Sequence, residues 1–156
     1  AWPVKVTDGT NSMPAMDAGA RAGFQKITDG TNTAIVDPCA NSALTRTAFV
    51  INQTAGAQVI TGAASKQTYI CSIFYVTATA QNVALVEGTG TVCATGTAGM
   101  AGGATAATGQ NWAANEGWTN PATGFWHFKT ATAADNLCLL QSGTGQISGG
   151  GSYVQN

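Results

Sequence analysis

The sequence predicts an all-β protein: an antiparallel β-sandwich, with jelly-roll connectivity as its leading topology. From Ala43 onward, short runs of β-forming residues alternate with turn residues at regular spacing, which is typical of a sandwich. No stretch of about 12 residues without glycine has apolar residues recurring with the 3.6-residue period of a helix, so we expect little helix. Ala, Thr and Gly dominate the chain and only 8% of its residues are charged, which favours thinly packed strands in one domain core.

Eight strands are expected, in chain order at 43–52, 57–61, 67–77, 83–87, 91–94, 125–130, 136–141 and 146–155. The segment 69–76 is apolar on both faces, which predicts a central strand covered on each side. In 125–130, Trp126 and Phe128 alternate with His127 and Lys129, as in a half-buried strand. Residues 95–121 are too many for a plain turn. We expect them to form a long loop that is functional or contacts a neighbouring molecule.

An internal repeat sets the N-terminal part of the chain apart. The sequence KVTDGTN at 5–11 recurs as KITDGTN at 26–32, and each Asp-Gly pair supplies the positive-φ residues of a tight hairpin turn. Pro38 then bars pairing in a sheet and marks a boundary. We therefore expect an arm of short β-hairpin repeats at 1–38 and a sandwich domain at 39–156.

Charge and composition argue against binding to nucleic acid and against a membrane-spanning segment. The net charge is -1, so the chain has no field to attract a polyanion, and binding to nucleic acid through phosphate contacts is not expected. The longest uncharged stretch, 88–115, consists mainly of Gly, Ala and Thr and is not apolar enough to cross a membrane. The N-terminus carries no basic patch followed by an apolar run, so a secretory signal is expected to be absent or already removed.

The sequence also does not predict a catalytic site. His127 is the only histidine, and its strand position beside Lys129 is that of an ordinary solvent-facing residue. No pattern pairs the acidic residues left over from turns, which are Asp17, Glu87, Glu116 and Asp135. The glycine-rich stretches lack the lysine and the helix of a phosphate-binding loop. The sequence thus predicts no enzyme, no cofactor and no metal site.

The most suggestive side chains lie in the long loop: Trp112, Asn115, Glu116 and Trp118. Flat aromatic faces together with amide and carboxylate groups are suited to a sugar-binding surface, and tryptophan also anchors protein interfaces. We consider three roles for this group: contact with a subunit or partner, packing of the loop onto the core, and binding of a glycan.

The four cysteines predict two disulfides, with free buried thiols as the alternative, because no Cys-x-x-Cys pair points to zinc. If 67–77 and 83–94 form one hairpin, antiparallel register places Cys71 opposite Cys93. Cys39 then pairs with Cys138 by elimination. A slip of two residues at the bulge 88–90 separates Cys71 from Cys93, and leaves free thiols or a Cys39–Cys71 pair.

Several motifs resemble virion proteins of tailed bacteriophages, including head-decoration (cement) proteins with a β-sandwich or jelly-roll domain. The motifs are the two TDGTN units, DPC at 37–39, YICS at 69–72, VALVEGTGTVC at 83–93 and NLCL at 136–139. The resemblance covers most of the chain. Its motifs are turns, strands and cysteines, so no catalytic residue is carried over.

The resemblance implies a non-enzymatic capsid decoration protein that binds the outer surface of the head. Its partner would be the major capsid protein or another virion protein, and its assembly a homotrimer. Such a chain is made in the bacterial cytoplasm without a signal peptide and meets an oxidising exterior at the virion surface after lysis. The long tryptophan loop suggests an alternative, a receptor-binding tail-fibre or spike component that recognises a host glycan through residues 112–118.

Overall fold

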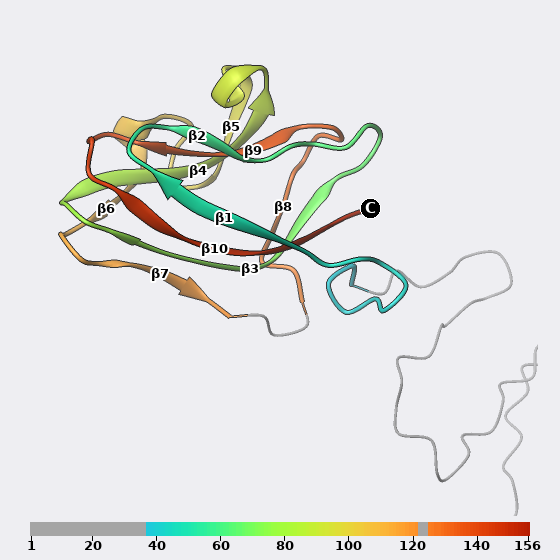
Figure 1. Ribbon diagram of the computed structural model, residues 1–156. Coiled ribbons are helices and arrows are strands. Elements are labelled where there is room, and N and C mark those ends of the chain that lie inside the picture. The colour runs from blue at the N-terminus through green and yellow to red at the C-terminus, as the bar shows by residue number, and fades with distance from the viewer. Residues whose placement is uncertain (1–36, 122–124) are drawn as a thin grey trace, which may run out of the picture. The chain divides into compact units, whose positions relative to one another are not determined.

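A computed structural model describes residues 37–121 and 125–156 of the chain (Figure 1). Asp37–Asn156 separate as one unit from Ala1–Val36. The predicted hairpin repeats and most of the predicted arm 1–38 lie outside the described residues. The account that follows concerns the predicted sandwich domain.

In the part of the chain that the structure describes, ten strands form two antiparallel sheets. The β3 sheet contains β1 (Thr47–Gln53), β10 (Ile147–Gln155), β3 (Thr68–Thr77), β7 (Gly117–Asn120) and β8 (Phe128–Lys129). The β4 sheet contains β2 (Ala57–Ile60), β9 (Asn136–Gln141), β4 (Gln81–Thr89), β5 (Thr95–Ala101) and β6 (Gln110–Trp112). Helix in the described residues is limited to two short 3-10 turns, η1 (Thr91–Cys93) and η2 (Ala106–Thr108). The predicted all-β sandwich is confirmed.

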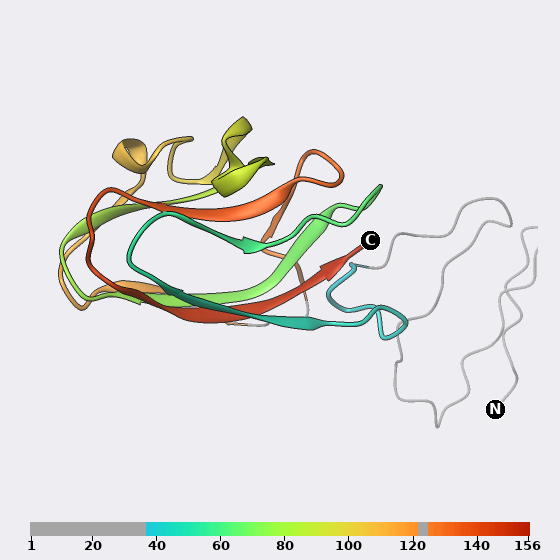
Figure 2. The same cartoon turned by 45° about the horizontal axis from the view of Figure 1, so that its top comes forward.

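The order of the strands is that of a jelly roll. Strands β7 and β8 lie one after the other along the same edge of β3, and β5 and β6 do the same along β4. With each such pair counted as one broken strand, each sheet is four strands wide, in the orders β1-β10-β3-β7 and β2-β9-β4-β5. The chain passes from one sheet to the other after β1, β2, β3, β6, β8 and β9. Figure 2 shows the two layers facing each other. This connectivity closes a double-sheet jelly roll.

The core lies between the two sheets. It is built from alternate residues of the central strands, whose side chains point inward because neighbours in a strand face opposite ways. Its buried members are Phe49, Ile51, Ile60, Ile70, Ile73, Tyr75, Val83, Leu85, Leu137, Leu139 and Ile147. On β3 the expected burial of both faces is wrong beyond Ile73, because Phe74 and Val76 are 53% and 49% exposed on the outer face.

The predicted strand 125–130 is reduced to the two residues of β8, and two further segments differ from the predicted elements. Residues 91–94 were expected to be a strand but form the turn η1, because Val92 and Cys93 adopt positive φ values of 54° and 56°. Residues 95–121 were expected to be one long loop but contain β5, β6 and β7. These strands are short, poor in large apolar residues and confined to sheet edges, so they lack the alternating pattern that predicts a strand.

The disulfides are Cys39–Cys71 and Cys93–Cys138. Two bridges were correctly expected, but the favoured pairing of Cys71 with Cys93 and Cys39 with Cys138 is wrong. It assumed that β3 and β4 form a hairpin, whereas these strands pair in different sheets. The alternative Cys39–Cys71 pair is the one that forms.

Each disulfide holds a loop segment on the outer face of one sheet. Ser152 pairs with Ser72 and Tyr153 with Ile70, so Cys71 is the extra residue of a β-bulge. Cys71 therefore turns outward, where it packs with Cys39 and Val154. On the other sheet, Cys93 of η1 is bonded to Cys138 of β9. These two residues form a buried cluster with Ala84 and Val86 on the outer face of the sheet.

Candidate functional site

The two tryptophans of the predicted site pack onto the core. The Trp112 and Trp118 rings both meet the Tyr75 ring edge to face, with centroids 6.1 and 6.3 Å away, and Trp118 also contacts Phe128 at 5.2 Å. Both indoles are half-buried, and the Trp112 Nε1 atom is buried without a hydrogen-bond partner among the described residues. Of the three roles considered, this geometry supports core packing.

Tyr75 lies at the centre of this aromatic group. Its side chain is buried between the sheets, and its hydroxyl donates a long hydrogen bond of 3.5 Å to Gln110 Oε1. Burial raises the pKa of the Tyr75 phenol to about 12, because a phenolate would lose its hydration there. The group is thus a neutral part of the core.

Asn115 and Glu116 are exposed, but their polar groups shape the turn between β6 and β7. The Glu116 carboxylate accepts a hydrogen bond from Ala113 N at 3.0 Å. Asn115 N donates to Thr77 O, and Thr77 N donates to Glu116 O, each at 2.8 Å. The four predicted residues thus lie close together. Asn115 and Glu116 form the turn, and the rings of Trp112 and Trp118 on either side of it face the core.

The other candidate side chains are scattered. His127 Nε2 lies 2.9 Å from Pro121 O, and the buried Glu87 carboxylate accepts a hydrogen bond from Ala131 N at 2.6 Å. Asp135 is buried, and Asp17 lies outside the described residues. Among residues 37–121 and 125–156, no three His, Cys, Asp or Glu side chains are grouped to hold a metal ion. Within the same ranges no helix has the length and apolar character of a membrane span.

A surface that sequence patterns did not single out lies on the outer face of the β3 sheet. Register aligns Val50, Gly150, Phe74 and Thr119 in one row across four strands. Val50 is 75% exposed and Phe74 53% exposed, and the glycine between them adds no side chain to the row. The next row along the strands consists of Asn52, Ser148, Val76 and Gly117. These two rows, which we call the β3 outer face, contain three of the five large apolar side chains exposed in the described residues and no charged group.

The other exposed aromatics lie toward one end of the same sheet. Trp126 is 42% exposed and packs edge-on against Tyr69, with ring centroids 6.2 Å apart. Lys129 Nζ lies 5.8 Å from the centroid of the Tyr69 ring, and the Asp37 carboxylate accepts a hydrogen bond from Trp126 N at 3.0 Å. The expected pairing of Trp126 with Phe128 on one face is therefore wrong, because only Phe128 packs against the core.

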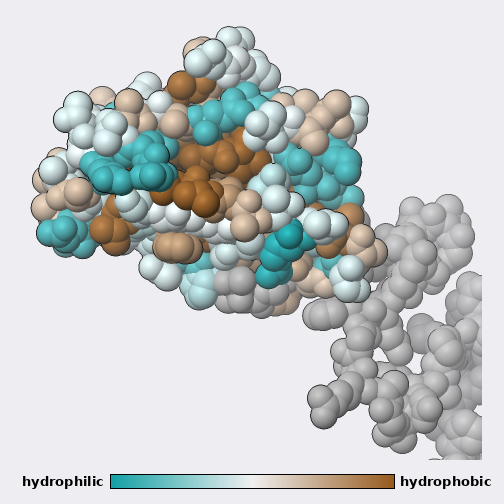
Figure 3. Space-filling model, in the orientation of Figure 1, coloured by the Kyte–Doolittle hydropathy of each residue, from teal (hydrophilic) through white to brown (hydrophobic). Residues whose placement is uncertain are grey.

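In Figure 3, hydrophobic surface gathers around β1 and between β1 and β2, with hydrophilic residues on either side. A sequence signal for the β3 outer face did exist, since Phe74 and Val76 alternate with Ile73 and Tyr75. Both alternating sets are apolar, however, so sequence could not tell which one faces the core.

Comparison with models of protein families, with characterised proteins and with solved structures gave no match.

Proposed function

We propose that this chain is a non-enzymatic structural protein of a tailed-bacteriophage virion, a decoration protein that binds the outer surface of the head. The resemblance of its turn, strand and cysteine motifs supports the virion role. The observation that carries the docking role is the β3 outer face, where Val50, Phe74 and Val76 are exposed together. Apolar patches of this kind mark interaction surfaces in proteins that are otherwise soluble.

The β3 outer face suits contact with a protein shell. Exposed Val50 and Phe74 in one row supply apolar area, and the absence of charge in both rows avoids the desolvation of ions on docking. Strand pairing on both sides holds the backbone of β10 and β3 in place beneath these side chains, so little ordering is needed on binding. The partner is the major capsid protein or another virion protein, and the resemblance adds a homotrimeric assembly.

Immunogold labelling of purified phage particles that carry the gene tests the virion role. Gold on the heads is the expected result. Particles that contain no copies of the chain overturn the proposal.

Redecoration of stripped particles tests the docking face. Val50→Asp and Phe74→Asp should lower head occupancy at least tenfold, because a charge on this face must be desolvated on binding. The control is Ala98→Asp, which adds the same charge at an exposed position of β5 on the other sheet. Unchanged occupancy with Phe74→Asp contradicts the assigned face.

The second candidate is a receptor-binding tail component, and one observation favours it. Phe125 and Trp126 are 58% and 42% exposed, and Trp126 and Lys129 both lie against the Tyr69 ring. An exposed aromatic surface of this kind, rather than the turned-in tryptophans at 112 and 118, is what a glycan could stack on. Gold labelling at the tail tip instead of the head would favour this function.

A further inference from the structure

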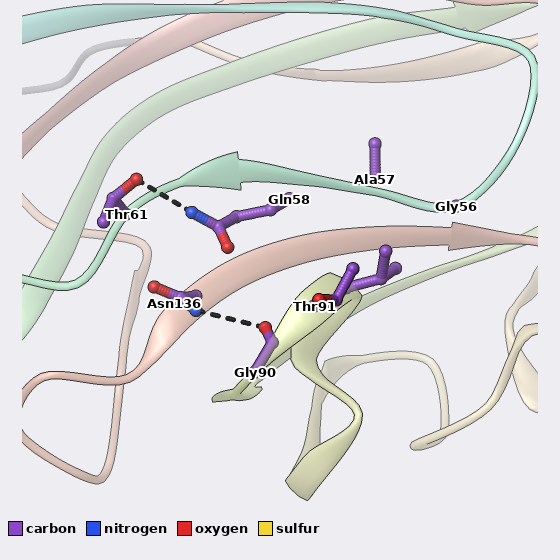
Figure 4. A pocket seen from close by; sticks show the side chains of 8 residues that line it. Gly56, Ala57, Gln58, Thr61, Gly90, Thr91 and Asn136 are labelled. Carbon is purple, nitrogen blue, oxygen red and sulfur yellow. Dashed lines mark hydrogen bonds between the residues drawn. The ribbon is translucent and has the colours of Figure 1, made fainter.

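An open hollow of about 610 Å³, with an uncharged lining of mixed apolar and polar character, lies on the outer face of the β4 sheet (Figure 4). Its volume falls within the usual range for small-molecule sites, about 300–1,000 Å³. One side is formed by β2 with Gln58 and the following Thr61, and the other by η1 and the start of β9 with Thr91 and Asn136. The Gln58 side chain points outward, since its register partner Cys138 belongs to the outer cluster.

The lining combines amide and hydroxyl groups. Gln58 Nε2 donates to Thr61 Oγ1 at 2.8 Å, and Asn136 Nδ2 donates to Gly90 O at a long 3.4 Å (Figure 4). Each amide nitrogen carries two N–H groups, so each keeps one for a ligand. Gln58 Oε1 accepts no hydrogen bond from any described residue, and Thr91 contributes an exposed hydroxyl. The polar part of the lining thus offers both donors and acceptors to a ligand.

The hollow has no charged lining residue, which decides the class of ligand. An anion would require a lysine, an arginine or a cluster of backbone N–H groups to offset its lost hydration. A neutral molecule rich in hydroxyl groups makes no such demand, because each hydroxyl both donates and accepts a hydrogen bond. Val92 adds an apolar wall against which the C–H face of a sugar ring can pack.

The η1 wall is held rigidly in an unusual conformation. Gly90, Val92 and Cys93 have φ values of 75°, 54° and 56°. Positive φ is a genuine outlier for a β-branched residue such as Val92, and such outliers concentrate at ligand-binding sites. Cys93 is fully buried and bonded to Cys138, so the wall keeps its shape without a ligand. A preformed wall reduces the entropy lost on binding.

We propose that this hollow binds a neutral carbohydrate, one sugar unit held by the Gln58 amide, the Thr91 hydroxyl and the Asn136 amide. The site lies on the β4 sheet, whereas the proposed docking face lies on the β3 sheet. Sugar binding can therefore be measured on the free protein and does not depend on the virion role.

The test is a titration followed by NMR of the ¹⁵N-labelled chain. The panel contains glucose, galactose, mannose, rhamnose and N-acetylglucosamine, with glucuronate and sialic acid as charged comparisons. At least one neutral sugar should shift the side-chain amide signals of Gln58 and Asn136, with a dissociation constant of about 1 mM, as befits an open site with few contacts. Shifts confined to the Trp126 indole, a response to the charged sugars alone, or no response to any sugar overturns the proposal.

Variants check the residues. Gln58→Ala and Thr91→Ala should weaken binding about tenfold each, the loss expected for one hydrogen bond. Both side chains are exposed, so the fold should persist. The matched control is Gln146→Ala: Gln146 is also an exposed glutamine whose Nε2 donates to one side-chain oxygen, that of Asn52, but it lies outside the hollow. Binding that survives Gln58→Ala, or that falls equally with Gln146→Ala, contradicts the assignment.

Discussion

Cys71 is bonded to Cys39 on the outer face of the β3 sheet, with 5.5 Å between their Cα atoms. Cys93, the next cysteine along the chain, lies on the outer face of the opposite sheet and bonds to Cys138. Neither bond joins the two sheets. The sandwich is therefore held together by its apolar core, and the disulfides fasten the segments that cross its outer faces.

Non-reducing peptide mapping should recover Cys39–Cys71 and Cys93–Cys138. Replacing both Cys39 and Cys71 with alanine should lower the free energy of unfolding by about 3.7 kcal/mol, the chain-entropy value for a loop of this length. The Cys93–Cys138 bond should persist in that variant and serves as the internal control. Recovery of a Cys71–Cys93 peptide would show that β3 and β4 pair as a hairpin after all.

Substitutions at neighbouring positions of β3 should have very different effects. Phe74→Ala removes an exposed side chain and should change the free energy of unfolding by no more than about 0.5 kcal/mol. Tyr75→Ala removes the ring that Trp112 and Trp118 pack against and should cost about 4 kcal/mol. Urea unfolding monitored by circular dichroism measures both. Equal losses would mean that the outer face is covered.

The raised pKa of Tyr75 predicts a loss of stability at high pH. A phenol that ionises near 12 in the folded state and near 10 when unfolded stabilises the fold fully below pH 10. Above pH 10 this contribution declines by up to about 1.4 kcal/mol per pH unit, until the folded protein also ionises near pH 12. The check is urea unfolding at several alkaline pH values, with phenolate absorbance followed in parallel. Tyr75→Phe should lack this component, and an identical pH profile in that variant would refute the assignment.

A glutamine network closes one end of the sandwich. Gln141 Nε2 donates to Gly143 O at 3.0 Å and to Gly145 O at 2.9 Å, and Gln81 Nε2 donates to Gly145 O at 3.0 Å. Gln53 Nε2 lies 3.3 Å from Gln141 Oε1. Gln141→Leu keeps the volume but leaves these partners unpaired, so it should destabilise the fold by about 2 kcal/mol.

The matched control for that network is Gln146→Leu at an exposed position, where thermal and urea unfolding should change little. Comparable destabilisation by the two variants would show that the buried network contributes nothing specific.

Strands β3, β9 and β10 were predicted to within one residue of their observed bounds. The predicted strand 136–141 coincides with β9, and the predicted strands 67–77 and 146–155 each begin one residue before β3 and β10. The edge strands β5 to β7 escaped prediction because Gly, Ala and Thr acquire strand structure there by pairing with β3 and β4. Edge pairing is a tertiary property, since it depends on a neighbour distant in the chain.

The sequence by itself determined the all-β class, the positions of the apolar central strands and the presence of two disulfides. These follow from local alternation, turn residues and cysteine number. Tertiary structure alone decided which sheet each strand joins, and with it the partner of Cys71, the inward turn of Trp112 and Trp118, and the exposure of Phe74. The physical reason is that each of these depends on contacts between segments far apart in the chain. A connection after β3 that crosses between the sheets and one that forms a hairpin can share the same local sequence pattern.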